Sequence, residues 1–330
     1  MKRSLLIIVL FISCIRLRAQ DPQLTQFYAA PQYLNPAFTG LTVEHRFVAN
    51  YRNQWPGIKK TYQTSMAAYD YNLSSVSSGI GVFAMQDVAG VAGLTHTQAG
   101  MSYAYRFTVR KTRELRLGLN GSYNLINLGF SKLTFNDQLI TGAATSNDAS
   151  NYSRKNYFDL GAGALYNAEK IWVGFSVKHL NKPNVSLIGS QQALPMTISL
   201  HGGYRYIIEG RSKTMIKKYF TASFNYRHEL RYDQLDLGFY YFHAPLNIGF
   251  WYRGLPFKNY PGHVNNECLA ILVGCEIPKR NLRIGYSYDL TISSLGLNNT
   301  MGAHEISLVY EYSQKKKRKS RSVLVTCPKF

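Results

Sequence analysis

The 330-residue chain is strongly basic yet sparsely charged, with 38 Lys and Arg against 18 Asp and Glu, a formal net charge of +20 and only 17% charged residues. Its 45% apolar residues and mean hydropathy of −0.20 exclude a disordered chain and a bundle of membrane helices, each of which needs about 20 consecutive apolar residues. Four Cys in so long a chain exclude a disulfide scaffold.

Residues 1–19 have the layout of a secretory signal peptide. Lys2 and Arg3 precede an apolar run over residues 5–14, and Ala19 stands at the exit. The run is too short to span a bilayer. We therefore expect the mature chain to begin near Gln20, outside the cytoplasm.

Residues 20–42 are predicted to form an irregular lead-in. Pro22, Pro31 and Pro36 cannot donate to a strand ladder, and the pairs at 35–36 and 39–40 are turn signals. The segment also holds aromatic side chains that need cover, either in the mouth of the folded domain that follows or on a partner protein. We favour the mouth for these residues, which are Phe27, Tyr28, Tyr33 and Phe38.

From about residue 43 to residue 313 one pattern repeats, with an apolar or aromatic residue at every second position between short polar turns. In residues 100–107, for example, Met, Tyr, Tyr and Phe occupy one strand face and Gly, Ser, Ala and Arg the other. The pattern predicts fourteen strands, at about 43–54, 60–73, 78–87, 94–109, 113–129, 156–168, 170–181, 195–209, 218–230, 233–243, 245–253, 264–276, 281–291 and 303–313.

The connections between these strands are short on one side and long on the other. An even strand count with both ends on the short side predicts a single all-β domain, a transmembrane antiparallel outer-membrane β-barrel. A secreted, water-soluble β protein would place many charged residues on its outward faces, whereas here the second face is mostly Gly, Ser, Asn and Ala, which suit the inside of a barrel. Tyr pairs near both strand ends fit aromatic girdles at the two interfaces.

Trp55 lies in the first outer turn, where we favour an interfacial anchor over a ligand contact. The expected inner face also carries charge. These residues form either an anion-favouring pore or an ion-pair network that holds the lumen shut, and we favour a blocked lumen, although fourteen strands do not decide it by size. The principal members are Arg106, Arg116, Arg205, Arg227, Arg253, Arg283, Asp289 and Glu305.

Residues 314–330 follow the last strand as a basic tail, expected on the periplasmic side. Seven positive charges and no acids predict a solvated, extended segment. It is a free tail, an anchor on acidic lipid headgroups or a docking strip for an acidic periplasmic partner. Nucleic-acid binding is excluded by compartment. The densest block is Lys315, Lys316, Lys317, Arg318 and Lys319.

The sequence carries no catalytic signature. The eight His are dispersed, without an HExxH or GxSxG motif, and the acidic residues are few and scattered. We therefore expect no enzyme, no bound metal and no cofactor.

Three motifs near the start narrow the function: QDPQLTQF at residues 20–27, LNPAFTG at 34–40 and YRNQW at 51–55. This order resembles the start of the PorP/SprF family, outer-membrane proteins of type IX secretion and gliding motility in Bacteroidota. The resemblance implies a non-enzymatic barrel in the outer-membrane lipid that works with periplasmic ring or peptidoglycan-linked proteins, or that anchors secreted surface proteins such as adhesins. Candidate partner contacts are the lead-in residues Phe27, Tyr28, Tyr33, Asn35, Pro36 and Phe38, together with Trp55 and the basic tail. The alternative is a general porin for small solutes.

Overall fold

The computed structural model describes residues 21–58, 62–110, 112–129, 133–144, 146, 154–210, 216–255, 257–258 and 265–313. The predicted signal peptide and basic tail, with Lys315, Lys316, Lys317, Arg318 and Lys319, lie outside the described residues, so both stay predictions.

Fourteen antiparallel strands, each paired with its neighbours in sequence, form a closed barrel in which β1 also pairs with β14. The prediction of an all-β barrel with fourteen strands is therefore confirmed. The strands are β1 (His45–Gln54), β2 (Tyr62–Leu73), β3 (Ser78–Ala89), β4 (Leu94–Arg110), β5 (Arg113–Asn127), β6 (Lys155–Ala168), β7 (Ile171–Lys178), β8 (Thr197–Gly210), β9 (Ile216–Glu229), β10 (Tyr232–His243), β11 (Leu246–Gly254), β12 (Asn266–Ile277), β13 (Leu282–Thr291) and β14 (Ala303–Tyr312).

Most strand bounds agree with the predicted bounds to within two residues. The largest difference is in β7, which was expected to continue to residue 181 and ends at Lys178. His179 follows with a φ of 59°, a left-handed conformation that turns the chain out of the strand. Alternation alone did not reveal this turn, because the residues after it are again partly apolar.

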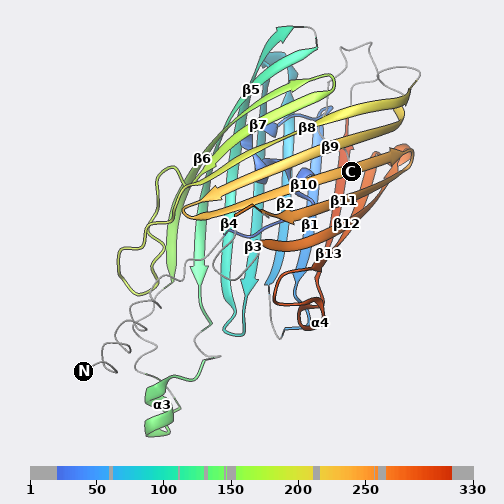
Figure 1. Ribbon diagram of the computed structural model, residues 1–330. Coiled ribbons are helices and arrows are strands. Elements are labelled where there is room, and N and C mark those ends of the chain that lie inside the picture. Colours follow the sequence, from blue (N-terminus) through green and yellow to red (C-terminus); the bar gives the residue numbers. More distant parts are fainter. Residues whose placement is uncertain are drawn as a thin grey trace.

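The two ends of the barrel differ in their connections (Figure 1). One end, here called the short-turn end, carries tight turns such as Ala244–Pro245 and the single-turn helices η3 (Ser74–Val76) and η6 (Pro278–Arg280). The other, the long-loop end, carries the extended connections, with α3 (Asn136–Thr141) and α4 (Leu297–Thr300). Since outer-membrane barrels place short turns in the periplasm, we expect the long-loop end to face the outside.

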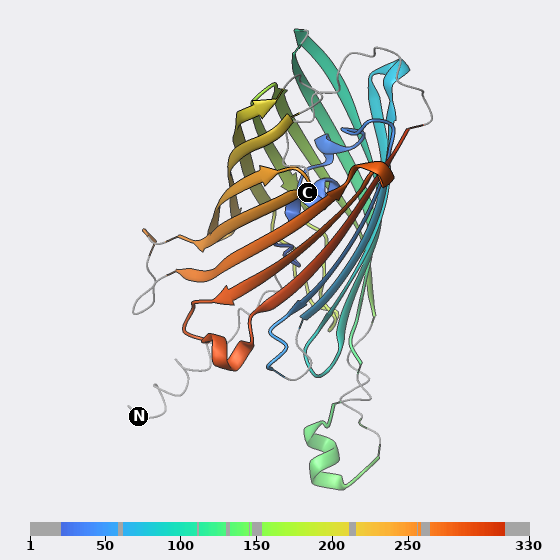
Figure 2. The ribbon, with the colours of Figure 1, turned by 90° about the vertical axis from the view of Figure 1, so that its right-hand side faces the viewer.

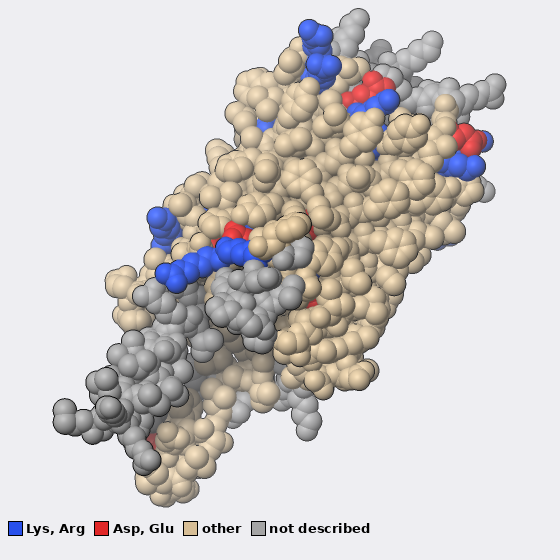
Figure 3. Space-filling view, viewed as in Figure 1, with Lys and Arg blue, Asp and Glu red and all other residues tan. Residues whose placement is uncertain are grey.

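The outer wall of the barrel is apolar. Side chains at alternate positions point outward, such as Met101 with 70% of its surface exposed and Leu119 with 63%. Lys, Arg, Asp and Glu gather toward the two ends, and a broad band without charge lies between them (Figure 3). This band matches the apolar belt of a barrel in lipid. None of the helices in the described residues is long and apolar enough to cross a bilayer.

The lead-in lies inside the barrel (Figure 2), where three short helical turns fold it compactly. These are η1 (Phe27–Ala29), α2 (Pro31–Leu34) and η2 (Pro36–Phe38). Pro31 and Pro36 occupy first helical positions, where a missing N–H costs nothing, and the Asn35 side chain caps η2 by accepting from Ala37 N. The lead-in packs with inward wall residues into one hydrophobic cluster.

Candidate functional site

The site is the filled lumen, and residues 21–42 are here called the plug. At the long-loop end, wall carboxylates accept hydrogen bonds from the plug backbone. Thr25 N and Gln26 N donate to the two carboxylate oxygens of Glu305 over 2.7 Å and 3.1 Å. The Thr25 hydroxyl donates to Asp289 over 2.6 Å. Charged acceptors make these bonds stronger than neutral ones.

Arginines balance these buried carboxylates. Arg52 lies 2.8 Å from Asp289 and 3.3 Å from Glu305, and Arg253 lies 3.1 Å from Asp236 and 3.6 Å from Asp289. All five side chains expose 6% or less of their surface. A buried charge without a partner costs free energy. Removing one of these residues would therefore strongly destabilise the folded barrel.

The first described residue, Asp21, is held by a second charge cluster at the same end. His179 Nε2 lies 3.2 Å and Lys178 Nζ 3.4 Å from the Asp21 carboxylate, and His179 Nδ1 lies 3.0 Å from Asp159. Burial opposes protonation of His179, but the carboxylates of Asp21 and Asp159 outweigh it and raise its pKa to about 10. Burial likewise favours the neutral form of Asp21, yet His179 and Lys178 hold its pKa well below 3.8.

In the middle of the barrel the plug is packed by aromatic rings and bonded through Asn35. Phe27 stands edge-on to Trp251 at 4.9 Å between ring centroids, and Tyr28 stands edge-on to Tyr240 at 5.4 Å. The Asn35 amide donates to the carbonyls of Ala164 and Phe175 over 3.0 Å and 3.2 Å. Both carbonyls belong to wall strands, so Asn35 ties the plug to β6 and β7.

At the short-turn end the wall also donates hydrogen bonds to plug carbonyls. The Arg116 guanidinium donates to the carbonyls of Ala37 and Thr39. Arg46 donates to the Phe38 carbonyl over 3.2 Å and forms a 2.7 Å ion pair with Asp70. Asp70 in turn accepts a hydrogen bond from Gly40 N, so this ion pair also holds the plug backbone.

Glycines on the wall make room for the plug backbone. A Cβ at Gly118 would lie 2.3 Å from Ala37 N, and one at Gly163 would lie 2.0 Å from the Asn35 side-chain oxygen. Gly121, on the same strand as Gly118, would meet only a Leu160 methyl at 3.6 Å, an ordinary contact. The small residues of the inner face therefore have a specific role where the plug touches the wall.

The plug runs through the lumen from one end to the other. Asp21 contacts residues at the end of β7, and Thr25 contacts β13 and β14 near the long loops. Thr42 contacts Glu311 near the end of β14, at the short turns. The chain thus enters the lumen at the long-loop end and leaves it at the short-turn end to begin β1.

The structure places the predicted residues in three settings. The lead-in residues Tyr28, Tyr33, Asn35, Pro36 and Phe38 are buried within the barrel, and Phe27 is partly buried. Trp55 directly follows β1 at the long-loop end, where its ring stands edge-on to Tyr62. Whether any of them contacts a partner stays a prediction.

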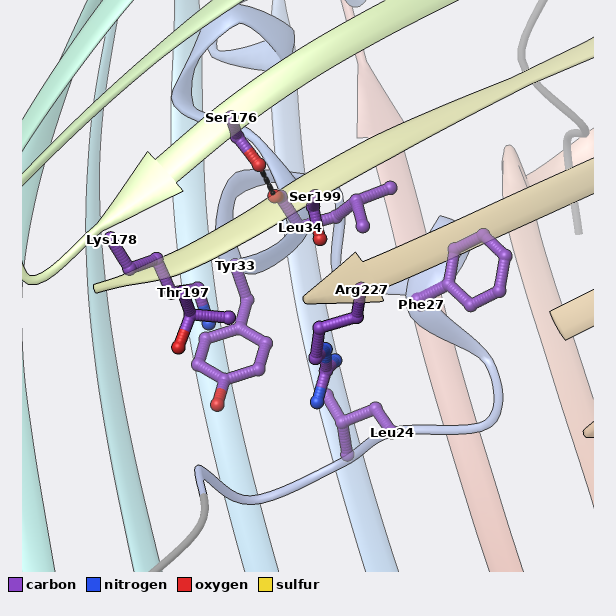
Figure 4. A pocket seen from close by; sticks show the side chains of 9 residues that line it. All are labelled: Leu24, Phe27, Tyr33, Leu34, Ser176, Lys178, Thr197, Ser199 and Arg227. Carbon is purple, nitrogen blue, oxygen red and sulfur yellow. Dashed lines mark hydrogen bonds between the residues drawn. The ribbon is translucent and has the colours of Figure 1, made fainter. Parts of the chain in front are cut away.

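The predicted lumen charges divide between the plug anchors and separate contacts. Arg253, Asp289 and Glu305 belong to the ion pairs at the long-loop end. Arg116 donates to plug carbonyls at the short-turn end. Arg283 pairs with Glu311 at 2.9 Å, and Arg205 lies over the Tyr219 ring. Arg106 donates its backbone N–H to Ser77 O, and Arg227 lines a small pocket between the plug and the wall (Figure 4).

The sequence alone did not predict the role of several residues that anchor the plug. The alternation of the first predicted strand contained the signal for two of them, since Arg46 and Arg52 share the inward face with Asn50. Asp21 and His179 carried no such signal, because neither lies in a strand. Their partners are brought close only by the path of the plug.

The chain is similar in part to three solved structures. The CymD monoaromatic hydrocarbon channel matches with a TM-score of 0.49 and 10% identity over 87% of this chain and 93% of that one. The Pseudomonas putida toluene transporter TodX matches with a TM-score of 0.45 and 9% identity over 85% and 92%. BamA from Haemophilus ducreyi, lacking POTRA domains 1–3, matches with a TM-score of 0.40 and 10% identity over 81% and 70%.

No curated protein matches the chain by sequence. A sequence profile of the family described as "Type IX secretion system membrane protein PorP/SprF" matches residues 17–310. This match spans nearly the whole barrel and the plug, and it agrees with a closed barrel in the outer membrane. The chain belongs to the PorP/SprF family of type IX secretion system membrane proteins.

Proposed function

We propose that the protein is a non-enzymatic platform of the secretion machinery that binds secreted surface proteins at its long-loop end. The observation that carries this proposal is the filled lumen. The plug is anchored at both ends and packed in the middle, which supports a barrel that offers surfaces rather than a passage. The alternative, a general porin, needs a continuous aqueous path where the plug now lies.

The long-loop end offers apolar side chains to a partner. Ile140 exposes 84% and Leu139 72% of its surface on α3, which projects beyond the strands (Figures 1 and 2). Phe257 and Ile188, in two other connections at this end, expose 93% and 60%. Exposed apolar residues of this kind favour a protein contact.

The short-turn end is basic and suits a different contact. Arg110, Arg113, Lys170 and Arg280 are exposed in its turns. We propose that this end, together with the basic tail, faces acidic lipid headgroups or an acidic periplasmic component of the machinery.

Site-specific photo-crosslinking in intact cells tests the proposal. A photo-crosslinking residue at position 140 or 257 is expected to capture a secreted surface protein. The same residue at position 101, on the lipid-facing wall, is the matched control and should capture none. Crosslinks to lipid alone from all three positions, or a large steady conductance of the purified barrel in planar bilayers, would favour the porin instead.

A further inference from the structure

The barrel wall has a step at its long-loop end, between β6 and β7. β5 pairs with β6 from Lys155 onward, whereas β7 pairs with β6 only from Ala162 to Asn167. Residues 155–160, here called the free edge, therefore have a neighbouring strand on one side only. The register with β5 has no bulge there and the segment contains no Pro, so the free edge is regular. Such an edge is a template for another extended chain.

The hydrogen bonds of the loop after β7 show which backbone groups point out of the free edge. Leu180 N donates to Leu160 O over 3.0 Å, and Leu160 N donates to the Asn181 side-chain oxygen over 3.1 Å. The Asn181 amide donates to Phe158 O over 2.7 Å. In an antiparallel sheet the N–H and C=O of one residue point to the same neighbour, and successive residues alternate. The backbone groups of Phe158 and Asn156 therefore also point out of the free edge.

The loop does not continue this ladder. Lys182 has a φ of 44°, a left-handed conformation that turns the chain away, and Pro183 has no N–H to donate. Within the part of the chain that the structure describes, the Phe158 N–H and the N–H and C=O of Asn156 have no hydrogen-bond partner. These groups have the spacing of a strand, so they match the backbone of one further extended chain.

The side chains beside the free edge suit an incoming strand on the outer face. Phe158 exposes 67% of its surface and stands edge-on to Tyr123 of β5 at 5.4 Å between ring centroids. On the inner face, Asp159 is already paired with His179. An added strand would therefore gain its side-chain contact on the outer face, where an aromatic or β-branched residue opposite Phe158 packs best.

The tilt of barrel strands argues against a second copy of this chain as the occupant. Strands of outer-membrane barrels are tilted by about 35–45°. Two copies related by a two-fold axis along the membrane normal would cross their β6 edges at about twice this angle, roughly 70–90°, which is too steep for a ladder. The C-terminal tail follows β14 at the short-turn end, away from the free edge. An extended segment of another polypeptide fits better than either.

We propose that the free edge of β6 is a strand-addition site that takes an extended segment of the secreted surface protein bound at the long-loop end. Main-chain hydrogen bonds to Asn156 and Phe158 give affinity with little demand on sequence, and the side-chain contact at Phe158 adds selectivity. This inference rests on the proposed function and names the way in which the partner is held.

Hydrogen exchange of the purified full chain in detergent tests whether the edge is free. Measured for single residues by NMR, the amides of Asn156 and Phe158 should exchange at least about tenfold faster than those of Tyr157 and Asp159, whose backbone groups face β5. Equal protection of all four amides would mean that the chain fills its own edge, and this result overturns the site.

Two substitutions of one residue separate the free edge from the loops around it. Asn156→Pro removes an N–H that points out of the edge and costs no bond to β5, whereas Asn156→Thr keeps this N–H. With a photo-crosslinking residue at position 140 in intact cells, Asn156→Pro should lower the yield of captured surface protein about tenfold. Asn156→Thr should leave the yield unchanged. An unchanged yield in Asn156→Pro overturns the site.

Phe158→Ala covers the case in which Asn156→Pro does not fold, as judged by heat-modifiable gel migration. Loss of the cross-strand contact should lower the captured yield about two- to fivefold, and an unchanged yield counts against the site in the same way. A photo-crosslinking residue at position 158 should capture the same protein as one at position 140. An adduct of two copies of this chain, or of lipid alone, from position 158 overturns the site.

The outcomes distinguish this site from the proposed function. Capture from positions 140 and 257 that survives Asn156→Pro overturns this inference alone. Absence of capture from these positions in the wild type overturns the platform, and the strand-addition site with it.

Discussion

The two ends of the plug share one kind of contact and differ in a second. At both ends a buried wall carboxylate accepts from plug backbone N–H groups and is paired with an arginine, Glu305 with Arg52 at the long-loop end and Asp70 with Arg46 at the short-turn end. At the short-turn end, wall arginines also donate to plug carbonyls, and Gly118 lets the two backbones touch. Charge pairing therefore holds both ends, and donor placement and steric fit are added at the short-turn end, so substitutions should affect the two ends differently.

The largest loss of folding stability is expected from breaking the buried ion pairs at the long-loop end. Arg52→Leu leaves Asp289 and Glu305 without their common partner, and an uncompensated buried charge costs roughly 3–5 kcal/mol. Urea unfolding followed by heat-modifiable gel migration measures the loss. The exposed Arg113→Gln is the control, and a loss no larger than in this control would contradict the role of the network.

The next largest effect is expected from crowding the plug against the wall at the short-turn end. Gly118→Ala places a Cβ 2.3 Å from the Ala37 backbone, and such overpacking costs roughly 1–3 kcal/mol. We expect a displaced plug, measured as a rise in planar-bilayer conductance. Gly121→Ala on the same strand meets only a side-chain methyl and should behave like the wild type. Equal conductance in both variants would show that the plug does not need this glycine.

The ion pair between Asp21 and His179 should make the stability of the plug contacts at the long-loop end depend on pH. The pKa of Asp21 lies well below 3.8, so its contribution is complete above about pH 4 and is lost in more acidic solution. The pKa of His179 is raised from 6.5 to about 10, so its contribution is complete below 6.5 and disappears by about pH 10.

The difference in thermal midpoint between wild type and Asp21→Asn should therefore be largest between about pH 4 and 6.5 and should become smaller as the pH rises toward 10, where His179 loses its charge. The variant keeps the size of the side chain, so packing is matched. A difference that does not change with pH would mean that charge has no part in holding Asp21.

The path of the plug also predicts on which side of the membrane its first residue lies. Testing this needs no change in stability. Since Asp21 lies at the long-loop end, an epitope tag placed directly before it should be reached by antibody on intact cells. A tag inserted in the Ser74–Val76 turn should need permeabilised cells. If both tags need permeabilisation, the plug enters the lumen from the periplasmic side instead.

The barrel could be predicted in detail because its information is local. Alternation along residues such as Met101, Tyr103 and Tyr105 identifies a strand without knowledge of its neighbours. Closure then follows from an even number of strands and from connections that alternate in length. The early end of β7 at Lys178 shows the limit, because a turn at His179 leaves no break in the alternation.

The plug contacts could not be predicted in the same way. Thr25 and Glu305 are 280 residues apart, and nothing local to either position indicates the other. Arg52 could have been assigned to the inner face by its alternation, but its pairing with Asp289 depends on where the closed barrel brings β1 and β13.

By itself, then, the sequence determined the fold class, the strands, the apolar belt and the family, because each depends on residues close together in the chain. Only the tertiary structure decided that the lead-in threads the lumen from the long-loop end and which residues anchor it. These features depend on long-range contacts inside a closed wall, where a small shift of the plug would unpair buried charges and drive backbone into backbone.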